Sequence, residues 1–299
     1  MPGHQKKLLA LIVTACLSCS AAQAEDLTGT LKKIKESGTV TLGYRDASLP
    51  FSYLNDAQQP IGYSIDLCQK IVDQIKVKVG EPNLKTEYVS VVAATRTPLL
   101  INGTIDMECG VTTNTVERQK QIGFLLTSYV ASAKYAVKKN AGINSLADLK
   151  GKSVVVITGG SGEWITKNLD REKAMGLKLL NAKDGAEAFL MLETGRAAAY
   201  INDDVQLMAT IAQSRSPDAY TLLPEPMSAE PYAIGIRKND PQFKTFADDA
   251  LRNLYSTGVI DTLYPKWFLQ PIPPKNAVIN LPISDALKQL IATPNDTGV

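Results

Sequence analysis

The segment from residue 96 to residue 124 limits most narrowly what this chain can fold into. Its pattern predicts a helix that begins near Pro98, then a turn, then a short strand at 105–109 in which apolar residues alternate. The strand leads into a hydroxyl-rich loop, 110–115, and a second helix begins at Val116. This alternation of helices and strands predicts an α/β fold.

The loop 110–115 and the helix after it carry groups that suit a small carboxylate ligand. Thr113 lies in the loop, and Arg118 lies in the first turn of the helix. Backbone N–H groups at a helix start, with hydroxyls and a guanidinium beside them, bind carboxylates through charge-assisted hydrogen bonds. We interpret this segment as one part of an anion site.

A second series of strands and helices repeats the arrangement further along the chain. A strand predicted at 154–158 leads into a glycine turn, 159–162, which opens a helix and includes Ser161. The turn is another candidate anion site. It lacks the GxGxxG spacing of dinucleotide-binding proteins, and no Gly-Lys-Ser/Thr follows as in a P-loop. Two such series, with the chain crossing between them twice, predict two α/β lobes and a cleft.

Three arginines stand at the ends of predicted strands or the starts of predicted helices. Arg45 follows a strand at 39–44, Arg96 begins a helix, and Arg118 lies in the segment described above. Ligands of open α/β sheets bind at the carboxyl ends of strands, so Arg45 is a site candidate; the alternative is a solvated loop residue. Three cations in one crevice repel one another, and an unpaired buried charge costs ~3–5 kcal/mol. The site should therefore favour a ligand with more than one negative charge.

Two adjacent carboxylates, Asp203 and Asp204, follow a strand predicted at 197–201. Such pairs occur in metal sites and in acid–base catalysis, but no third ligand is evident near them. The alternative is that both carboxylates cap the helix that follows. The sequence therefore predicts no metal site here and leaves the role of Asp203 open.

Residues 1–24 have the features of a secretory signal peptide. Lys6 and Lys7 precede a short apolar run, and the small residues up to Ala24 provide a cleavage site. The run is shorter than the ~20 residues that a membrane span needs. The rest of the chain has the ordinary composition of a soluble globular protein.

Cleavage after Ala24 lowers the formal net charge of the chain and removes its histidine. The formal net charge of the whole chain is +2, and it falls to about zero when Lys6 and Lys7 are lost, so nothing basic indicates nucleic acid. The chain has one histidine, His4, and it is lost as well. A Ser-His-Asp triad and a histidine-ligated metal are therefore excluded.

Two cysteines, Cys68 and Cys109, remain after cleavage. In an oxidising compartment outside the cytoplasm we expect them to form one disulfide, which would join the first long helix to the strand at 105–109. The alternative is a pair of buried free thiols.

The pattern of the segment 96–124 resembles that of the amino-acid-binding proteins of bacterial ABC importers, solute-binding protein family 3. The residues that carry the resemblance are Pro98, Leu100, Gly103, Asp106, Thr113, Glu117, Arg118 and Phe124. Seven pieces in order, two of them within this segment, are most similar to the glutamate/aspartate-binding branch: GYRDASLPFSY, NGTIDMECG, TTNTVERQKQ, LADLKGKSVVV, AKDGAEAF, IRKNDPQFK and PIPPKN. The resemblance covers nearly the whole mature chain.

The resemblance implies a two-lobed periplasmic-binding-protein fold of type II, with three-layer α/β lobes joined by a two-strand hinge. We expect the first lobe to comprise residues 25–130 and 229–299, and the second to comprise residues 131–228. It also implies a periplasmic monomer that needs no cofactor, binds an acidic amino acid and delivers it to an inner-membrane ABC permease.

The resemblance further implies a role for each candidate residue. Arg118, with Thr113, would hold the α-carboxylate of the ligand, and Asp203 of the other lobe would hold its α-ammonium. The side-chain carboxylate would be held by Arg45 and Arg96, with help from Ser161 at its helix N-terminus.

Three positions depart from the glutamate/aspartate-binding branch, which has serine, serine and histidine there. This chain has Ala93, Val111 and Gly185. Each lost hydrogen bond is worth roughly 0.5–3 kcal/mol, so the departures bear on affinity and side-chain selectivity.

Two other functions share this architecture. One is a secreted arogenate or prephenate dehydratase, which needs a general acid in the cleft; without histidine, Glu163 or Asp203 would have to serve. The other is a ligand sensor that presents its closed form to a chemoreceptor, and it would use the same site as an importer.

Overall fold

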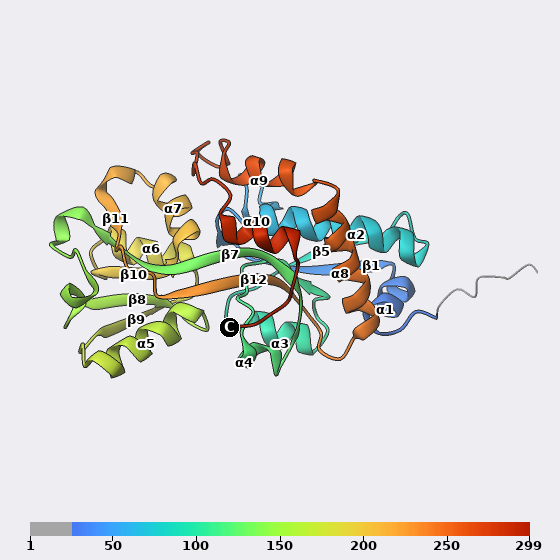
Figure 1. Ribbon diagram of the computed structural model, residues 1–299, viewed down its shortest axis with the longest axis horizontal. Helices are drawn as coiled ribbons and strands as arrows, with labels where there is room; N and C mark the ends of the chain where they lie inside the picture. Colours follow the sequence, from blue (N-terminus) through green and yellow to red (C-terminus); the bar gives the residue numbers. More distant parts are fainter. Residues whose placement is uncertain (1–25) are drawn as a thin grey trace, which may run out of the picture.

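The computed structural model describes residues 26–299 and has two α/β lobes side by side along its long axis (Figure 1). The predicted signal peptide and the cleavage site after Ala24 lie outside the described residues. Within residues 26–299, no helix is both long and apolar enough to cross a membrane. The two alternating series of strands and helices confirm the α/β fold predicted from the sequence.

The first lobe lies at the right of Figure 1 and contains both ends of the described chain. Its helices are α1 (Gly29–Ser37), α2 (Tyr63–Val79), α3 (Arg96–Ile101), α4 (Val116–Gln119), α8 (Pro241–Ser256), α9 (Ile260–Phe268) and α10 (Asp285–Ala292). Its own strands are β1 (Thr39–Tyr44), β5 (Lys85–Ser90) and β6 (Met107–Glu108), with a small separate sheet of β2 (Ala47–Ser48), β3 (Ser52–Leu54) and β4 (Pro60–Ile61). Strand β1 pairs in parallel with β5 on one side and with β6 on the other.

Helix α2 forms because most of its apolar residues recur at helical spacing and face the core. These residues are Ile65, Cys68, Ile71, Val72 and Ile75, and each is buried. The helix ends at Gly80, which adopts a left-handed conformation that glycine tolerates at low cost. The helix thereby fixes the side of the sheet from which the disulfide described below reaches the loop 110–115, which we call the binding loop.

The second lobe lies at the left of Figure 1. Its strands are β8 (Ser153–Ile157), β9 (Lys178–Ala182), β10 (Ala199–Asp203) and β11 (Tyr220–Leu222), and its helices are α5 (Ser161–Lys173), α6 (Gly185–Glu193) and α7 (Asp204–Ala212). Short 3-10 helices lie at Lys139–Ala141, Leu146–Leu149 and Pro217–Ala219. Strand β8 pairs in parallel with both β9 and β10, so the loops after β8 and β10 open at the same edge of the sheet.

Two long antiparallel strands, β7 (Gly123–Lys138) and β12 (Ser228–Ile236), run through both lobes. They join all the principal strands into one sheet of order β5-β1-β6-β12-β7-β10-β8-β9, with β11 on β7. The core to which β7 contributes changes along its length. Residues up to Ala131 pack in the core of the first lobe, and residues from Ala133 pack in that of the second.

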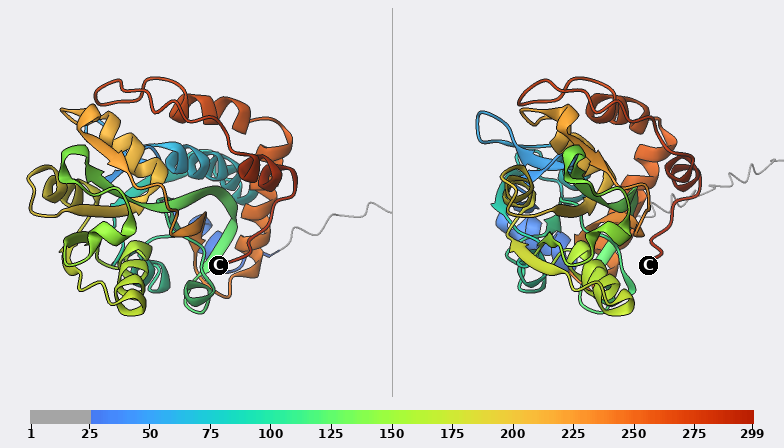
Figure 2. Two further views of the ribbon diagram at one scale, coloured as in Figure 1. Left: turned by 60° about the vertical axis from the view of Figure 1, so that its left-hand side comes forward. Right: turned by 90° about the vertical axis from the view of Figure 1, so that its left-hand side faces the viewer.

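The C-terminal residues after α10 return to the loop that precedes α4. Figure 2 shows this red segment descending from α10 beside α8 to the C-terminus. Val299 pairs with the loop on both sides of Thr115: its N–H donates to the Asn114 carbonyl (3.1 Å), and its carbonyl accepts from the Val116 N–H (2.9 Å). The segment therefore supports the loop that carries Thr113 and leads to Arg118.

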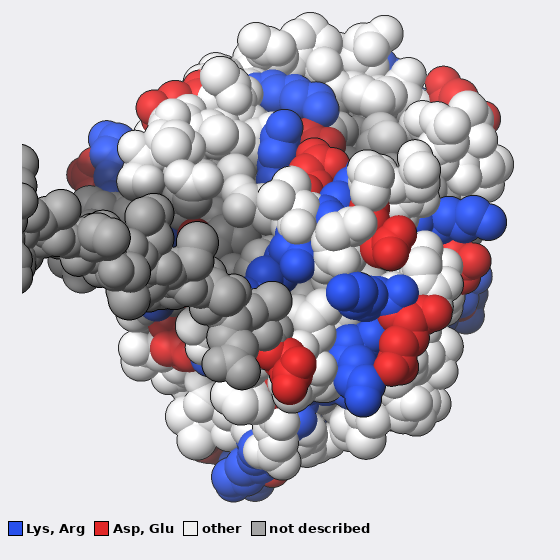
Figure 3. Space-filling view, turned by 90° about the vertical axis from the view of Figure 1, so that its right-hand side faces the viewer, with Lys and Arg blue, Asp and Glu red and all other residues white. Residues whose placement is uncertain are grey.

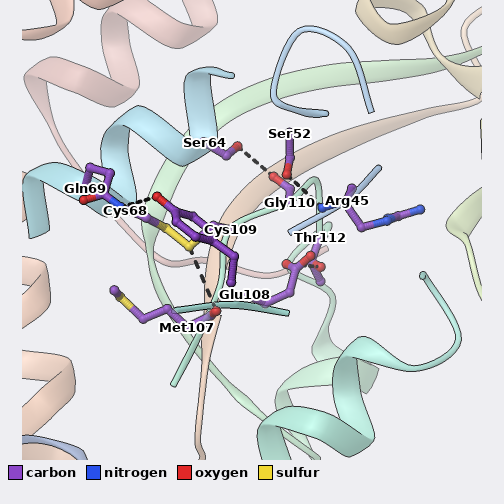
Figure 4. The surroundings of a disulfide bond; sticks show 11 residues. Arg45, Ser52, Ser64, Cys68, Gln69, Met107, Glu108, Cys109, Gly110 and Thr112 are labelled. Carbon is purple, nitrogen blue, oxygen red and sulfur yellow. Dashed lines mark hydrogen bonds between the residues drawn. A yellow bond between two sulfur atoms is a disulfide. The ribbon is translucent and has the colours of Figure 1, made fainter. Parts of the chain in front are cut away.

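The structure confirms the disulfide between Cys68 of α2 and Cys109, and the alternative of two free thiols is wrong (Figure 4). The two Cα atoms are 6.2 Å apart. A neighbouring hydrogen bond reinforces the link, because the Ser64 hydroxyl donates to the Gly110 carbonyl (2.7 Å). Strand β6 is shorter than the predicted 105–109, although the N–H of Cys109 still donates to Gly43 of β1. The start of the binding loop is thus attached to both α2 and β1.

The end of the first lobe, seen in Figure 3, carries positive and negative side chains interspersed over its surface. Several form ion pairs between exposed groups, such as Arg252 with Asp249 on α8 (2.8 Å). Exposed pairs of this kind contribute little to stability. Where Figure 3 shows residues 26–299 uncovered, charges of both signs therefore lie close to one another.

We expect loss of the disulfide to lower the melting temperature markedly. The two cysteines are 41 residues apart in sequence, and closing a loop of that length stabilises the folded state by about 4 kcal/mol in the chain-entropy model. For a chain of this size that corresponds to a fall of about 7 °C. Thermal unfolding of the Cys68→Ala/Cys109→Ala variant, and of the unaltered protein with and without reductant, measures it.

The double variant also serves as the control for the reductant. It has no disulfide, so adding reductant should leave its melting temperature unchanged. Equal melting temperatures for the oxidised and reduced unaltered protein would contradict the prediction.

Candidate functional site

A cavity lies between the two lobes, and five of the six predicted binding residues line it. These are Arg45, Arg96 and Thr113 from the first lobe and Ser161 and Asp203 from the second. The sixth, Arg118, is not among the lining residues, but its guanidinium bonds to Thr113, which lines the cavity, and to Gly159 of the second lobe. The structure therefore brings together residues that are up to 158 positions apart in the sequence, counted from Arg45 to Asp203.

Arg45 and Arg96 enter the cavity from two neighbouring parts of the first lobe. Arg45 directly follows β1, and its backbone N–H donates to the Ser52 hydroxyl (2.9 Å), while Arg96 is the first residue of α3. Their exposed fractions are 3% and 4%. Among the described residues, no hydrogen bond or ion pair involves either guanidinium group. Two buried cations thus face the cavity without a directly bonded counter-ion in the protein.

The burial of these cations perturbs their proton affinities. Burial, followed by the positive charge of Arg118, lowers the pKa of Arg96 to about 9. Burial also lowers the pKa of Arg45, while the nearby carboxylates of Glu108 and Asp184 oppose the shift. Arg96 still carries its charge at neutral pH, because the lowered pKa remains above 7.

Arg118 and Thr113 are held by bonds that cross between strands and lobes. The Arg118 guanidinium donates to the Thr113 carbonyl (3.0 Å) and to the Gly159 carbonyl of the second lobe (3.5 Å). The Thr113 hydroxyl donates to the carboxylate of Glu230 on β12 (2.5 Å). Thr115 caps α4 by accepting from the Arg118 N–H (3.1 Å). The start of α4 is therefore attached to β12 through Thr113 and contacts the glycine turn of the second lobe in this structure.

Asp203 ends β10 and stands at the N-cap position of α7, yet its side chain does not cap that helix. Its carboxylate accepts from Gln206 (3.1 Å) and from the Tyr232 hydroxyl of β12. Burial, and then the negative charge of Glu230, raise the pKa of Asp203 to about 7. Asp204 instead accepts from the N–H groups of Val205 (2.7 Å) and Ser132 (3.2 Å), so the interpretation of both carboxylates as caps is wrong for Asp203.

The glycine turn before α5 brings the second lobe into contact with the first. Ser161 is the first residue of α5, and Gly160 and Gly162 also line the cavity. Gly159 has a φ of +77°, and a Cβ at this position would lie 3.0 Å from the backbone of Ala94. Only glycine combines that conformation with so close an approach. The N-terminus of α5 therefore reaches the cavity across a glycine contact between the lobes.

The three positions that depart from the glutamate/aspartate-binding branch have different surroundings. Ala93 and Val111 line the cavity and make part of its wall apolar. A Cβ at Gly185 would lie 3.1 Å from the Ala47 carbonyl and 3.3 Å from the Tyr200 hydroxyl, so a larger side chain there requires the neighbouring groups to shift. Ser48, a buried hydroxyl that sequence reasoning missed, also lines the cavity.

Three other polar residues of the site were missed. Gln206 lies three positions after Asp203 at a helix start, a spacing that predicts neighbouring side chains. Glu108 alternates with the apolar residues of its strand and lies at the strand end that is beside Arg45. This alternation was a signal that could have found it. Glu230 comes from the return strand β12, and nothing local in the sequence connects it to Thr113.

Comparison with known proteins identifies the group to which this chain is similar. Residues 40–270 match the family model described as bacterial extracellular solute-binding proteins, family 3. The chain is 46% identical to the L-glutamate/L-aspartate-binding protein of Pseudomonas aeruginosa over 97% of this chain and 96% of that one. It is 39% identical to the glutamate/aspartate import solute-binding protein of Escherichia coli over 98% and 99% of the two chains.

Solved structures agree with the sequence comparison. An ancestral arginine-binding protein bound to arginine has a TM-score of 0.70 and 31% identity, covering 77% of this chain and 98% of that one. An ancestral amino-acid-binding protein described as a precursor of cyclohexadienyl dehydratase has a TM-score of 0.69 and 28% identity, covering 80% and 99%. The predicted two-lobed fold of type II is thereby confirmed, and the chain belongs to the bacterial extracellular solute-binding proteins of family 3.

Proposed function

We propose that this protein captures an acidic amino acid, glutamate or aspartate, between its two lobes and delivers it to the permease of an ABC transporter. The observation that carries the proposal is that two arginines and one buried aspartate line a single cavity between the lobes, with a third arginine, Arg118, bonded to Thr113 of the same cavity. An acidic amino acid carries two carboxylates and one ammonium, which matches that set of charges. The names of the relatives from Pseudomonas aeruginosa and Escherichia coli support the same ligand class.

The proposed contacts follow from which groups are already bonded within the protein. Arg45 and Arg96 have guanidinium groups that bond to no described residue, so we assign them to the side-chain carboxylate of the ligand, with Ser161 beside them. Arg118 already spans the two lobes, so a carboxylate bound to it would also contact the loop at Thr113. We assign it to the α-carboxylate.

Asp203 is the proposed partner of the ammonium group. Gln206 and Tyr232 orient its carboxylate, and both donate to it from within the protein. An ammonium near Asp203 would favour the ionised carboxylate, which burial and Glu230 otherwise disfavour. Binding of the ligand therefore offsets an electrostatic cost that the protein carries at this position.

We propose that the first lobe comprises residues 25–130 and 229–299, that the second comprises residues 131–228, and that β7 and β12 form the hinge. In support, the change of core along β7 falls between Ala131 and Ala133, and β12 begins at Ser228. Because the proposed contacts come from both lobes, ligand binding favours the closed form, which a permease would recognise. Small-angle scattering with and without glutamate would measure this closure.

The location and assembly of the protein are parts of the same proposal. We propose that residues 1–24 are removed after Ala24 and that the mature protein acts in the periplasm as a monomer without a cofactor. The relatives named as import solute-binding proteins support this location.

We further propose that the protein binds its ligand without chemical conversion. A dehydratase would need a general acid in the cleft, and Glu163 is poorly suited to this role. Burial favours its protonated form, but hydrogen bonds from Lys167 (2.6 Å) and Gly159 (2.8 Å) outweigh that effect and lower its pKa. Asp203 has a raised pKa but is engaged by two donors.

The similarity to a protein described as a dehydratase precursor is the observation that favours an enzyme. We expect that incubation of the protein with prephenate or arogenate gives no product.

We expect glutamate or aspartate to bind with a dissociation constant of ~1 μM or better, about −8 kcal/mol. Isothermal titration calorimetry on refolded, ligand-free mature protein measures this, with glutamine, asparagine and citrate as comparison ligands. The amides lack one carboxylate and would leave the charges of Arg45 and Arg96 without a counter-ion. Preferential binding of glutamine over both acidic amino acids would contradict the proposal.

We expect the Arg96→Met variant to bind glutamate roughly 10- to 100-fold more weakly, because a hydrogen bond to a charged group is worth about 1.5–3 kcal/mol. Its melting temperature should not fall, because the variant removes a buried charge that Arg118 repels. Titration calorimetry and thermal unfolding measure the two effects.

Arg171→Met is the matched control, since Arg171 is an exposed residue of α5 that bonds to Asn168 (2.8 Å). It should bind glutamate normally. Equal affinities for the Arg96 and Arg171 variants would show that Arg96 has no part in binding.

We expect glutamate affinity to fall about tenfold from pH 8 to pH 6. The pKa of Asp203 is raised to about 7, so the carboxyl group is mostly protonated at the lower pH and a poor partner for an ammonium. Binding at pH 7 should also release protons, which titrations in buffers of different ionisation enthalpy detect. The Asp203→Asn variant should bind more weakly and with little pH dependence. A constant affinity from pH 6 to pH 8 would rule out this role for Asp203.

A further inference from the structure

One buried carboxylate near the cavity has no role in the contacts proposed above. Glu108 lies on β6 with an exposed fraction of 1%. One carboxylate oxygen accepts from the Thr112 hydroxyl (2.6 Å), and the other has no hydrogen-bond partner among residues 26–299. A buried carboxylate with an unbonded oxygen is costly, so its retention needs an explanation.

Glu108 lies next to Arg45. The two are brought together by the parallel pairing of β1 with β6, in which Gly43 is opposite Glu108. Figure 4 shows Glu108 beside Thr112, on the same side of β6 as Arg45. A Cβ on Gly110 would lie 2.2 Å from a Glu108 carboxylate oxygen and 2.9 Å from Cγ of Arg45. Gly110 therefore leaves the space that both side chains occupy.

Arg45 and Arg96 form the proposed side-chain subsite, the part of the cavity that would bind the side chain of the ligand. The carboxylate of Glu108 acts electrostatically on both arginines. It raises the pKa of Arg45 and of Arg96, opposing the effect of burial on each. Thr112 fixes the orientation of Glu108, and no described cation forms an ion pair with it. Its charge is therefore available to the subsite as a whole rather than neutralised in a separate pair.

We propose that Glu108 is a specificity-determining residue that sets the net charge of the side-chain subsite to one positive charge. Arg45 and Arg96 supply two positive charges, and Glu108 supplies one negative charge. Asp184, the other carboxylate that acts on Arg45, caps α6 and forms an ion pair with Lys183 (3.8 Å), so it is not counted with the subsite. The subsite then matches a ligand side chain with a single negative charge and discriminates against neutral and doubly charged side chains. This inference rests on the proposed function, because it concerns the subsite to which the ligand's side chain is assigned.

O-phosphoserine is a suitable probe, because its side chain is about as long as that of glutamate and carries close to two negative charges at pH 7.5. We expect the mature protein to bind glutamate at least tenfold more tightly than phosphoserine. The Glu108→Gln variant keeps the shape and removes the charge, so the subsite becomes doubly positive. The ratio of glutamate affinity to phosphoserine affinity should therefore fall tenfold or more in this variant.

Two control variants distinguish an effect of the negative charge of Glu108 from an effect on the structure of the site. Thr112→Val removes the hydrogen bond to Glu108 and keeps its charge, so the affinity ratio should stay close to that of the unaltered protein. Glu230→Gln removes another buried carboxylate, one bonded to Thr113 away from the side-chain subsite, and should change both affinities by similar factors. A purely structural role for Glu108 would weaken both ligands equally.

A measurement on the unaltered protein tests the inference even if Glu108→Gln fails to fold. Phosphoserine gains its second side-chain charge near pH 6. Its affinity relative to glutamate should therefore fall between pH 5 and pH 7.5, and the comparison with glutamate cancels the titration of Asp203.

An unchanged affinity ratio in Glu108→Gln, or a relative phosphoserine affinity independent of pH, overturns the inference and leaves the proposed function intact. Absence of glutamate binding by the unaltered protein overturns both.

Discussion

The burial of positive charge at the contact between the lobes is the constraint on which the rest of the structure depends. Arg45, Arg96 and Arg118 approach one another in surroundings that disfavour their charged forms. Each buried charge would cost several kcal/mol without compensation. The protein supplies part of that compensation through buried carboxylates, and in our account the carboxylates of the ligand supply the rest.

The fold holds this charged cluster in place through attachments on several sides. The disulfide and Ser64 attach the start of the binding loop to α2, while the C-terminal segment pairs with the end of the same loop. Glu230 binds Thr113 from β12, a strand shared by both lobes. The binding loop therefore has little freedom of its own, and in the closure that we propose the second lobe, with α5 and Asp203, is the part of the site that moves. This division suits a site whose two halves meet around a ligand.

The sequence predicted the fold class and most of the candidate site because both depend on local patterns. Strand ends, glycine turns and helix starts are visible as short segments, and Arg45, Arg96, Ser161 and Asp203 each occur at one of them. The disulfide followed from the count of cysteines and the expected compartment. The resemblance to a known family then supplied the pairing of these pieces across two lobes, which no local pattern contains.

Other features were not predictable because they depend on which strands become neighbours. Glu230 meets Thr113 only through the pairing of β12 beside the loop, 117 positions away in sequence. Glu108 is a different case, since its place at the end of a strand beside Arg45 was within reach of the alternation pattern. The side chain of Asp203 does not cap α7 but accepts from the side chains of Gln206 and of Tyr232 on β12, and the second of these is a distant residue.

The central claim is that the arginines and Asp203 divide the charges of one bound amino acid between the two lobes. A crystal structure of the mature protein with glutamate tests it most directly. The account predicts the side-chain carboxylate within hydrogen-bond distance of Arg45 and Arg96, the α-carboxylate on Arg118 and the ammonium on Asp203. A glutamate bound in the reverse orientation, or with its ammonium away from Asp203, would contradict it.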